Sequence, residues 1–478
     1  MFFKRSHVFF TPDEMSRWGL EPDDCTLVYV QQRPGGKIVR KKLAFVIRSQ
    51  AFTGFPQGYI ELFLKQRDPR DAELLTRGMM DCTTLGLPLA PGLKFKGNLL
   101  RSLKQDVAVR NVVGQLKSSK TGSATLSLPC GWGKTACALA VVSLIGRKAF
   151  VLVHTRLLAT QWEERISTFL PGARVKVMEG SSDFEADPGG TDVVIGLMQS
   201  LAKVPQDVQM SNRFSSFGLL IVDEAHHAPC TSIRSAMLCF GARHTLGLTA
   251  TPYRQDGLTD FITWSCGQPA LVIPPKFLDC EVHVVDFARK RKADKSELMM
   301  AGIAGCTLVD QLACSQERND FICDLAVKSA QALRSGILVV TSRRAHAEAL
   351  YSGVRGLMGD RDTGLIMGGC EEGVSTRETG RESSGRPHVI ISTMQMVCEG
   401  FDRGDSLRGL VLASPRSHSS ESTWLVQTVG RVCRAAAGGA SGGSQPSVVY
   451  DIVDQNSTCK SMFRQRKTGY QRFGCKMK

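Results

Sequence analysis

The chain has 478 residues, of which 42% are hydrophobic and 22% charged, and its formal net charge is +15. The length exceeds what one hydrophobic core can organise, and the composition argues against a disordered chain. Because no apolar run reaches membrane-spanning length and the start lacks a signal peptide's apolar core, we expect neither a membrane protein nor a secreted one. The positive charge favours a polyanionic partner such as nucleic acid, but a solvated basic surface explains it equally well.

Residues 1–95 contain short β-favouring runs separated by turn signals, which predicts a small mixed N-terminal accessory domain. From residue 96, buried-strand runs alternate with helical stretches, a pattern typical of parallel βαβ units. We therefore predict a first α/β lobe at 96–270. Its expected strands are 124–128, 149–153, 192–195, 219–222 and 245–248.

The stretch 271–312 is mixed and is predicted to connect two lobes. A second series of strands and helices follows at 313–455, so the predicted fold class is α/β with two tandem parallel-sheet lobes. The expected strands are 336–340, 389–392, 409–413 and 448–452.

The last segment, 456–478, is a basic tail without acidic residues. In this tail Arg464, Arg466, Tyr470 and Arg472 could contact phosphates or stack on a base. A tail packed on the second lobe is the alternative.

A phosphate loop is predicted where the run 124–128 gives way to the helical stretch 136–144. Gly131 and Gly133 would let the backbone wrap a polyanion, Lys134 would reach the β- and γ-phosphates of ATP, and Thr135 would bind Mg²⁺. Leu128 replaces the first glycine of the usual pattern, and a plain strand-to-helix turn is the alternative.

Two carboxylates follow the apolar run 219–222. We expect Asp223 to hold Mg²⁺ and Glu224 to orient and deprotonate the water that attacks the γ-phosphate. A solvated turn is the alternative interpretation of such a pair.

The order of these segments resembles the motif set of helicase superfamily 2 across residues 100–454. The matching segments are 128–135 (motif I), 153–162 (motif Ia), the DEAH box 223–226 (motif II), 248–252 (motif III), 340–343 (motif IV), 392–402 (motif V) and 427–434 (motif VI). The resemblance implies two RecA-like lobes and an enzyme that hydrolyses ATP with Mg²⁺.

Motif III contributes Thr249 and Thr251, whose hydroxyls can hydrogen-bond His226 and relay the state of the nucleotide. Taken singly, each threonine is better explained as an ordinary strand-to-turn residue.

Gln427, Arg431 and Arg434 lie at helical spacing, as expected of an arginine finger that stabilises charge on the γ-phosphate. In motif V the resemblance places Asp402 at the ribose or the lobe interface.

Five residues are candidate contacts to nucleic-acid phosphates. Thr155 and Arg156 begin a helix, and the resemblance assigns Thr393 a phosphate contact. Arg343 and Gln199 follow strands, and capping a helix is the alternative role for both.

Three sequence segments are similar to those of the xeroderma pigmentosum group B branch. This branch includes the poxviral transcript-release helicase and relatives from other large DNA viruses. The three segments lie at 128–131, 247–254 and 430–434. Two features depart from this branch. Arg254-Gln255-Asp256 stands where Arg-Glu-Asp is usual, so a glutamine replaces the glutamate. The glutamine that would recognise the adenine base has one candidate, Gln105, whose spacing is irregular.

We therefore predict an ATP-dependent motor acting on single- or double-stranded DNA, with viral transcription or replication machinery as a candidate partner. The alternatives are an RNA-directed helicase and a non-catalytic, nucleotide-switched binding protein. The 16 scattered cysteines favour a reduced intracellular compartment, which for a viral protein means the host cytoplasm or the virion, and the nucleus is also compatible.

Overall fold

A computed structural model describes the chain except residues 1, 5–6, 33–37, 45–46, 49–52, 71–72, 74–79, 82, 120, 130, 181–182, 184–189, 205–213, 251–253, 255, 275–276, 278, 289–307, 368–386, 399–406, 419–423 and 434–445. Within the described segments, no helix is both long and apolar enough to cross a membrane. The chain forms two compact units. One consists of residues 1–128 and 133–273, the other of residues 129–132 and 274–478.

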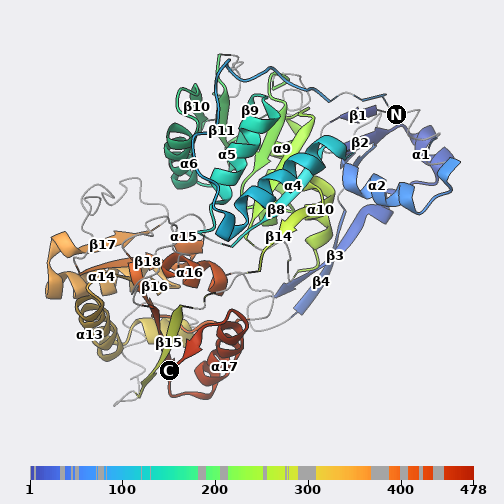
Figure 1. Cartoon of the computed structure of the whole chain (residues 1–478). Helices are drawn as coiled ribbons and strands as arrows, with labels where there is room; N and C mark the ends of the chain where they lie inside the picture. The colour runs from blue at the N-terminus through green and yellow to red at the C-terminus, as the bar shows by residue number, and fades with distance from the viewer. Residues whose placement is uncertain are drawn as a thin grey trace. The chain divides into compact units, whose positions relative to one another are not determined.

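A parallel sheet of seven strands lies at the centre of the first unit, in the order β10-β11-β9-β12-β13-β8-β14 (Figure 1). Its strands are β8 (Ser123–Ser127), β9 (Ala149–Val153), β10 (Val175–Met178), β11 (Val193–Leu197), β12 (Leu219–Val222), β13 (His244–Thr249) and β14 (Pro269–Val272). The five predicted strands are present, each within two residues of its expected bounds. Only the two edge strands, β10 and β14, were not predicted.

Both faces of this sheet are covered, because neighbouring residues of a buried strand point to opposite faces. Phe150 and Leu152 of β9 share one apolar cluster with α7, α9 and α10, while Val151 between them is also fully buried. Helices α4, α5 and α6 pack against the sheet as well. The helices are α4 (Gln105–Ser118), α5 (Lys134–Ile145), α6 (Arg156–Phe169), α7 (Met198–Leu201), α9 (Thr231–Leu238) and α10 (Thr259–Cys266).

The N-terminal part is mixed, as predicted, and its described apolar residues join the core of the first unit. Phe10 and Phe55 pack edge to face, and Tyr59 contacts Trp264 of α10 with ring centroids 5.4 Å apart. This part contains a five-stranded sheet, β5-β6-β2-β1-β7, and a β3-β4 hairpin. Its elements are β1 (Phe2–Lys4), β2 (His7–Phe10), α1 (Pro12–Trp18), η1 (Pro22–Cys25), β3 (Thr26–Gln32), β4 (Ile38–Ala44), β5 (Ile47–Arg48), β6 (Thr53–Pro56), α2 (Gln57–Lys65) and β7 (Met80–Asp81).

The second unit has its own parallel sheet of seven strands, in the order β17-β18-β16-β19-β20-β15-β21 (Figure 1). They are β15 (Cys280–Phe287), β16 (Gly336–Thr341), β17 (Thr363–Ile366), β18 (His388–Thr393), β19 (Leu407–Leu412), β20 (Ser447–Asp454) and β21 (Lys476–Met477). The four predicted strands are all present. Two differences concern segments that we expected to lie outside the lobe: residues 280–287, within the expected connection, form β15, and the tail contributes β21.

Helices cover both faces of the second sheet too. Leu338 and Val340 of β16 lie in a cluster with α15, α16 and α17, whereas Ile337 and Val339 lie in another cluster with α13 and α14. The helices are α12 (Leu308–Ala313), α13 (Gln316–Leu333), α14 (Arg344–Met358), α15 (Met394–Cys398), α16 (Trp424–Val432) and α17 (Ser457–Arg472). The predicted fold class, two parallel-sheet α/β lobes, is confirmed.

Candidate active site

The parallel register of the first sheet brings its functional segments to one edge. Ser127 of β8 lies opposite Thr249 of β13, and Val222 of β12 lies opposite Leu152 of β9. Because all these strands run in the same direction, the segments that follow them meet at the carboxyl edge of the sheet, where open α/β sheets bind ligands.

The phosphate loop leads from β8 into α5. Gly131 and Gly133 have φ angles of 77° and 78°, a region that favours glycine. A Cβ at Gly133 would lie 2.6 Å from Nε2 of Gln105, so the loop and this buried amide are in close contact. The candidate adenine-reading glutamine of the sequence therefore lies beside the loop, and its Oε1 also accepts from the Leu100 N–H at 2.8 Å.

Helix α5 begins at Lys134, and its N-cap, Gly133, has no side chain with which to cap it. The first N–H groups of a helix lack partners within the helix and favour an anion. The two glycines, Lys134 and Thr135 therefore fit the polyphosphate of a nucleotide.

Asp223 follows β12 and is 7% exposed. Its Oδ2 accepts a hydrogen bond from the indole N–H of Trp162 at 2.8 Å, and its Oδ1 accepts from the Glu224 N–H at 2.9 Å. Burial and, next, the charge of Glu224 raise the pKa of the Asp223 carboxyl. A divalent cation would compensate this buried negative charge, so the site fits Mg²⁺.

Glu224 has a φ of 48°, which is uncommon for a residue other than glycine and is typical of functional sites. Its Oε1 lies 3.9 Å from Nζ of Lys134, and its Oε2 lies 3.2 Å from Nδ1 of His226. A carboxylate held between the phosphate-loop lysine and a histidine is suitably placed to act as a base for water.

His226 connects this carboxylate to motif III, because its Nδ1 also lies 3.3 Å from Oγ1 of Thr249. Arg254 donates to the His226 carbonyl and forms an ion pair with Asp256. Partial burial and, next, the charge of His226 lower the pKa of the neighbouring His227 to about 3 and keep its ring neutral at physiological pH. Thr251, the second threonine assigned to coupling, lies outside the described residues.

In the first unit, the three residues predicted to contact nucleic acid form contacts with nearby residues of the same unit. Thr155 caps α6 by accepting from the Leu158 N–H at 3.3 Å. Arg156 is exposed and pairs with Glu179 at 3.2 Å, and Gln199 donates to the His154 carbonyl at 2.9 Å.

In the second unit, α16 carries Gln427, which is buried, and Arg431. Arg431 donates to the carbonyl groups of Val397 at 2.9 Å and Cys398 at 3.4 Å, so motif VI is hydrogen-bonded to the end of α15. Arg434 and Asp402 lie outside the described residues.

Thr393 ends β18 and is buried, and Arg343 is the N-cap residue of α14. Arg343 forms an ion pair with Asp310, Nε to Oδ1, at 2.5 Å.

Two tail residues considered as possible contacts to nucleic acid are buried. Arg466 forms two hydrogen bonds with the Asp451 carboxylate, at 2.8 and 2.7 Å, and the Tyr470 hydroxyl donates to Asp451 Oδ2 at 2.8 Å. An internal carboxylate needs such partners. For these two residues the alternative interpretation, a tail packed on the second lobe, is the one that the structure shows.

Trp162 belongs to the site, although we did not predict a functional role for it. It lies in α6, is 1% exposed and donates a hydrogen bond from its indole N–H to the Asp223 carboxylate. Its only signal in the sequence is its place at the end of the motif Ia segment.

Comparison with known proteins finds helicases among the relatives of this chain. A family described as "Type III restriction enzyme, res subunit" matches residues 100–254. A protein of Acanthamoeba polyphaga mimivirus named for ATP-dependent RNA helicase activity is 25% identical over 385 residues, 78% of this chain and 68% of its own. The DNA 3'-5' translocase XPB2 of Sulfurisphaera tokodaii is 36% identical over 136 residues, 27% of each chain. The chain belongs to helicase superfamily 2.

This helicase lies in the xeroderma pigmentosum group B-like branch, and its resemblance to members from large DNA viruses is confirmed by the mimivirus relative. It is an ATP-hydrolysing enzyme of the helicase type. The structure of S. cerevisiae Dbp5 bound to RNA and ADP BeF3 covers 78% of this chain and 88% of its own with a TM-score of 0.54. Because the two are only 13% identical, this likeness concerns the fold alone.

Proposed function

We propose that this helicase couples ATP hydrolysis in its first unit to movement along DNA, and that Glu224 is the base that activates the attacking water. The observation that carries the proposal is the arrangement of Glu224 between Lys134 and His226, at 3.9 and 3.2 Å. Asp223 and Thr135 would hold Mg²⁺, which when bound neutralises phosphate charge.

His226 would couple the binding and hydrolysis of ATP to the rest of the chain. Its ring contacts both the catalytic carboxylate and Thr249, so loss of the γ-phosphate would change the hydrogen bonding of motif III. Thr251 and Asp402 are proposed partners in the same coupling. Thr155, Arg156, Gln199, Arg343 and Thr393 are proposed to contact the phosphates of the strand, which makes binding tolerant of sequence and sensitive to salt.

The proposal is tested by ATPase measurements with and without DNA on the wild type and on Glu224→Gln and Lys134→Ala. Removing a general base costs typically about 10² to 10⁴ in rate, whereas ATP binding by Glu224→Gln should persist. Lys134→Ala should weaken ATP binding itself. Equal hydrolysis in the presence and absence of DNA would count against coupling, and a wild type without turnover would favour the nucleotide-switched binding protein.

Arg431, Arg434 and Gln427 are proposed to stabilise the charge that develops on the γ-phosphate. An arginine in this role contributes about 10³- to 10⁵-fold in rate. Arg431→Ala should therefore lower kcat by at least about 10³ and leave ATP affinity nearly unchanged. Exposed Arg361→Ala, in the same unit, is the matched control, and an equal effect of both variants would refute the assignment.

An RNA-directed helicase is the second candidate, because the mimivirus relative is named for RNA and XPB2 for DNA. Competition between DNA and RNA as activators of the ATPase distinguishes them. We expect DNA to activate at lower concentration, as would suit viral transcription or replication.

A further inference from the structure

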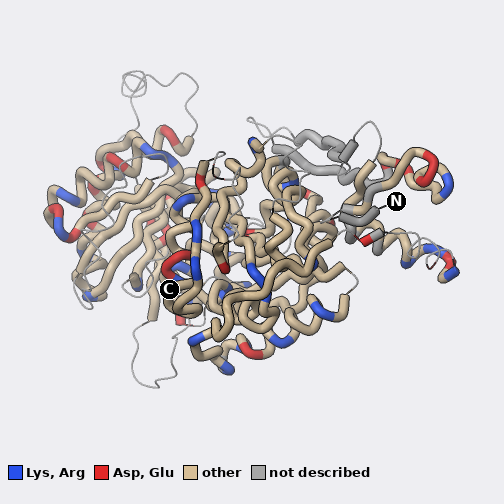
Figure 2. The backbone as a smooth tube through the Cα atoms, turned by 90° about the horizontal axis from the view of Figure 1, so that it is seen from above, with Lys and Arg blue, Asp and Glu red and all other residues tan. Residues whose placement is uncertain are grey.

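The C-terminal helix α17 has two faces of different character. One face is docked on the second sheet through Arg466 and Tyr470, which both bind Asp451. A neighbouring, exposed face carries Lys460, Arg464 and Lys467. Figure 2 marks the Lys and Arg positions of the chain, including those of this helix.

The docked face prevents the helix from rotating about its axis. Arg466 is 2% exposed and also donates to the Arg416 carbonyl at 2.7 Å. A Cβ at Gly469 would lie 2.5 Å from the ring of His418, so the helix lies as close to the unit as this residue allows. The three cations therefore point to solvent permanently.

The basic face lacks compensating charge. Residues 455–478 contain no Asp or Glu. Among the described residues, no carboxylate forms an ion pair with Lys460, Arg464 or Lys467. The cations that are neutralised are others: Arg466 pairs with Asp451, and Lys478 with Glu281 at 3.5 Å.

The spacing of the three cations matches a polyanion whose charges lie at regular intervals. Positions 460, 464 and 467 recur at intervals of four and three residues, so their side chains share one side of the helix. With a rise of 1.5 Å per residue they span roughly 10 Å, over which one DNA strand presents about three phosphates.

We propose that Lys460, Arg464 and Lys467 form an auxiliary site for the phosphate backbone of nucleic acid, outside the helicase motifs. The inference rests on the proposed function for its ligand, but the site itself requires no ATP. It adds affinity without reading sequence, because phosphate contacts carry no base information. It also assigns the binding role of the tail to its exposed face and not to Arg466 and Tyr470.

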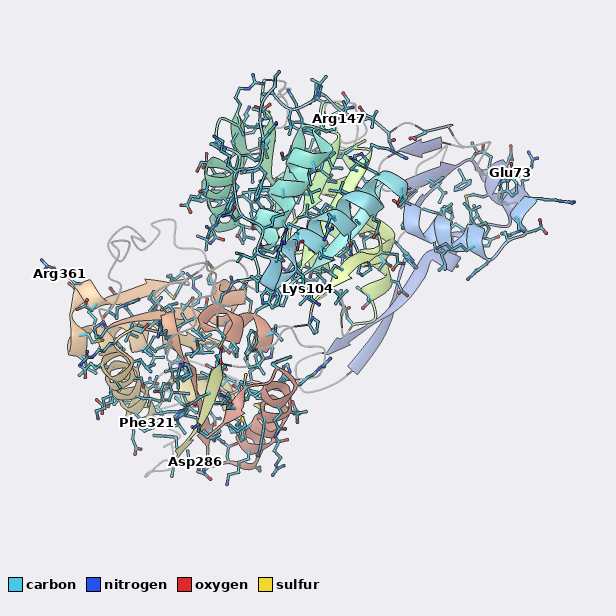
Figure 3. All side chains as sticks on the ribbon, viewed as in Figure 1. Glu73, Lys104, Arg147, Asp286, Phe321 and Arg361 are labelled. Carbon is cyan, nitrogen blue, oxygen red and sulfur yellow. The ribbon has the colours of Figure 1, made fainter. Side chains whose placement is uncertain are left out.

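The test compares the triple variant Lys460→Gln, Arg464→Gln, Lys467→Gln with the wild type in equilibrium binding of a labelled duplex between 50 and 200 mM salt. A matched control, Lys328→Gln, Arg355→Gln, Arg361→Gln, removes three exposed cations elsewhere in the same unit. Figure 3 shows Arg361 pointing away from the ribbon. We expect about 10-fold weaker binding or more at low salt for the triple variant alone. The slope of log affinity against log salt should fall by about 2 to 3, since each phosphate contact contributes about 0.9.

Equal affinity and slope for the triple variant and the control would overturn the inference. So would a loss of binding to polyglutamate but not to the duplex, which would indicate an acidic protein partner. A variant with Arg at positions 460 and 467 should bind as the wild type does, and thermal melting checks that the triple variant is folded. The wild type's DNA-stimulated ATPase is measured separately. If it is absent while the triple variant still loses affinity, the proposed motor function fails and the binding site stands.

Discussion

The indole N–H of Trp162 donates to Oδ2 of Asp223 at 2.8 Å, joining helix α6 to the carboxylate at the end of β12. The other oxygen of this carboxylate accepts from the Glu224 N–H. Both oxygens are thus oriented by the protein. Replacing a group that orients a metal-binding side chain typically costs about 10- to 100-fold in metal affinity or activity.

Trp162→Phe should therefore raise the Mg²⁺ concentration needed for half-maximal ATPase activity by about 10-fold or more. At saturating Mg²⁺, kcat should largely recover, because Glu224, the proposed base, is retained. Trp18→Phe, which alters an indole in α1, is the control. If the Mg²⁺ requirement of Trp162→Phe equals that of the control, the positioning role is refuted.

Arg466→Ala should strongly destabilise the protein. The substitution leaves the Asp451 carboxylate, which is fully buried, without its cation, and such a loss costs about 3 to 5 kcal/mol. Lys328→Ala breaks the exposed pair with Asp324 and should cost at most about 1 kcal/mol. Urea unfolding of the full chain measures both. Similar unfolding midpoints for the two variants would contradict this account.

Acid should destabilise the second unit through His346. The ring is 2% exposed, with Nδ1 2.7 Å from Thr341 Oγ1 and Nε2 3.0 Å from Asn319 Oδ1. Burial and, next, the charge of Arg318 lower its pKa to about 3. The unfolded chain, with a histidine pKa of about 6.5, binds more protons below that pH. The stability from neutral His346 is thus complete above pH 6.5 and is lost as the pH falls toward 3.

His346→Gln should accordingly reduce the loss of unfolding free energy between pH 6.5 and 4, by up to about 1.4 kcal/mol per pH unit. The measurement is urea unfolding at several pH values, with His283→Gln in β15 as the control. An unchanged acid dependence in His346→Gln would show that this histidine is not responsible.

The rate of cysteine alkylation should be lower for buried thiols than for exposed ones. Cys137 of α5 and Cys266 of α10 are fully buried, which raises the pKa of each thiol to about 12, whereas Cys230 and Cys314 are exposed. Because the thiolate is the reactive form, iodoacetamide at pH 8 should modify the exposed pair first. Mass spectrometry of the native and urea-unfolded protein compares the sites. Native Cys137 reacting as fast as Cys230 would disprove the burial.

The predictable parts of the fold are those with local patterns. The central strand β12 is a continuous apolar run because both of its faces are buried, and Asp223 and Glu224 follow it directly. Strands β10 and β14, at the sheet edges, are partly exposed; Lys176 interrupts the apolar run of β10, and β14 begins at Pro269. In β15, polar residues such as Glu281 and His283 alternate with apolar ones, which is typical of a half-buried strand, but the charged cluster at 289–292 led us to interpret the whole stretch as a connection.

Contacts between distant residues could not be predicted from one sequence. Trp162 and Asp223 are separated by 61 positions, and no spacing rule links an indole to a carboxylate so far away. Composition showed the tail to be basic, but it could not distinguish Arg466, which is internal, from Arg464, which faces solvent. That distinction depends on Asp451, a residue of another element.

Strand β15 has a consequence for how the protein is made. It lies between β20 and β21, whose residues come more than 150 positions later in the chain. Pairings between such remote segments form slowly, and a growing polypeptide lacks β20 until its synthesis has passed residue 454 and β21 until it has passed residue 477. The first sheet, complete by residue 272, can assemble while the ribosome is still translating, whereas the second must wait with β15 unpaired and open to aggregation.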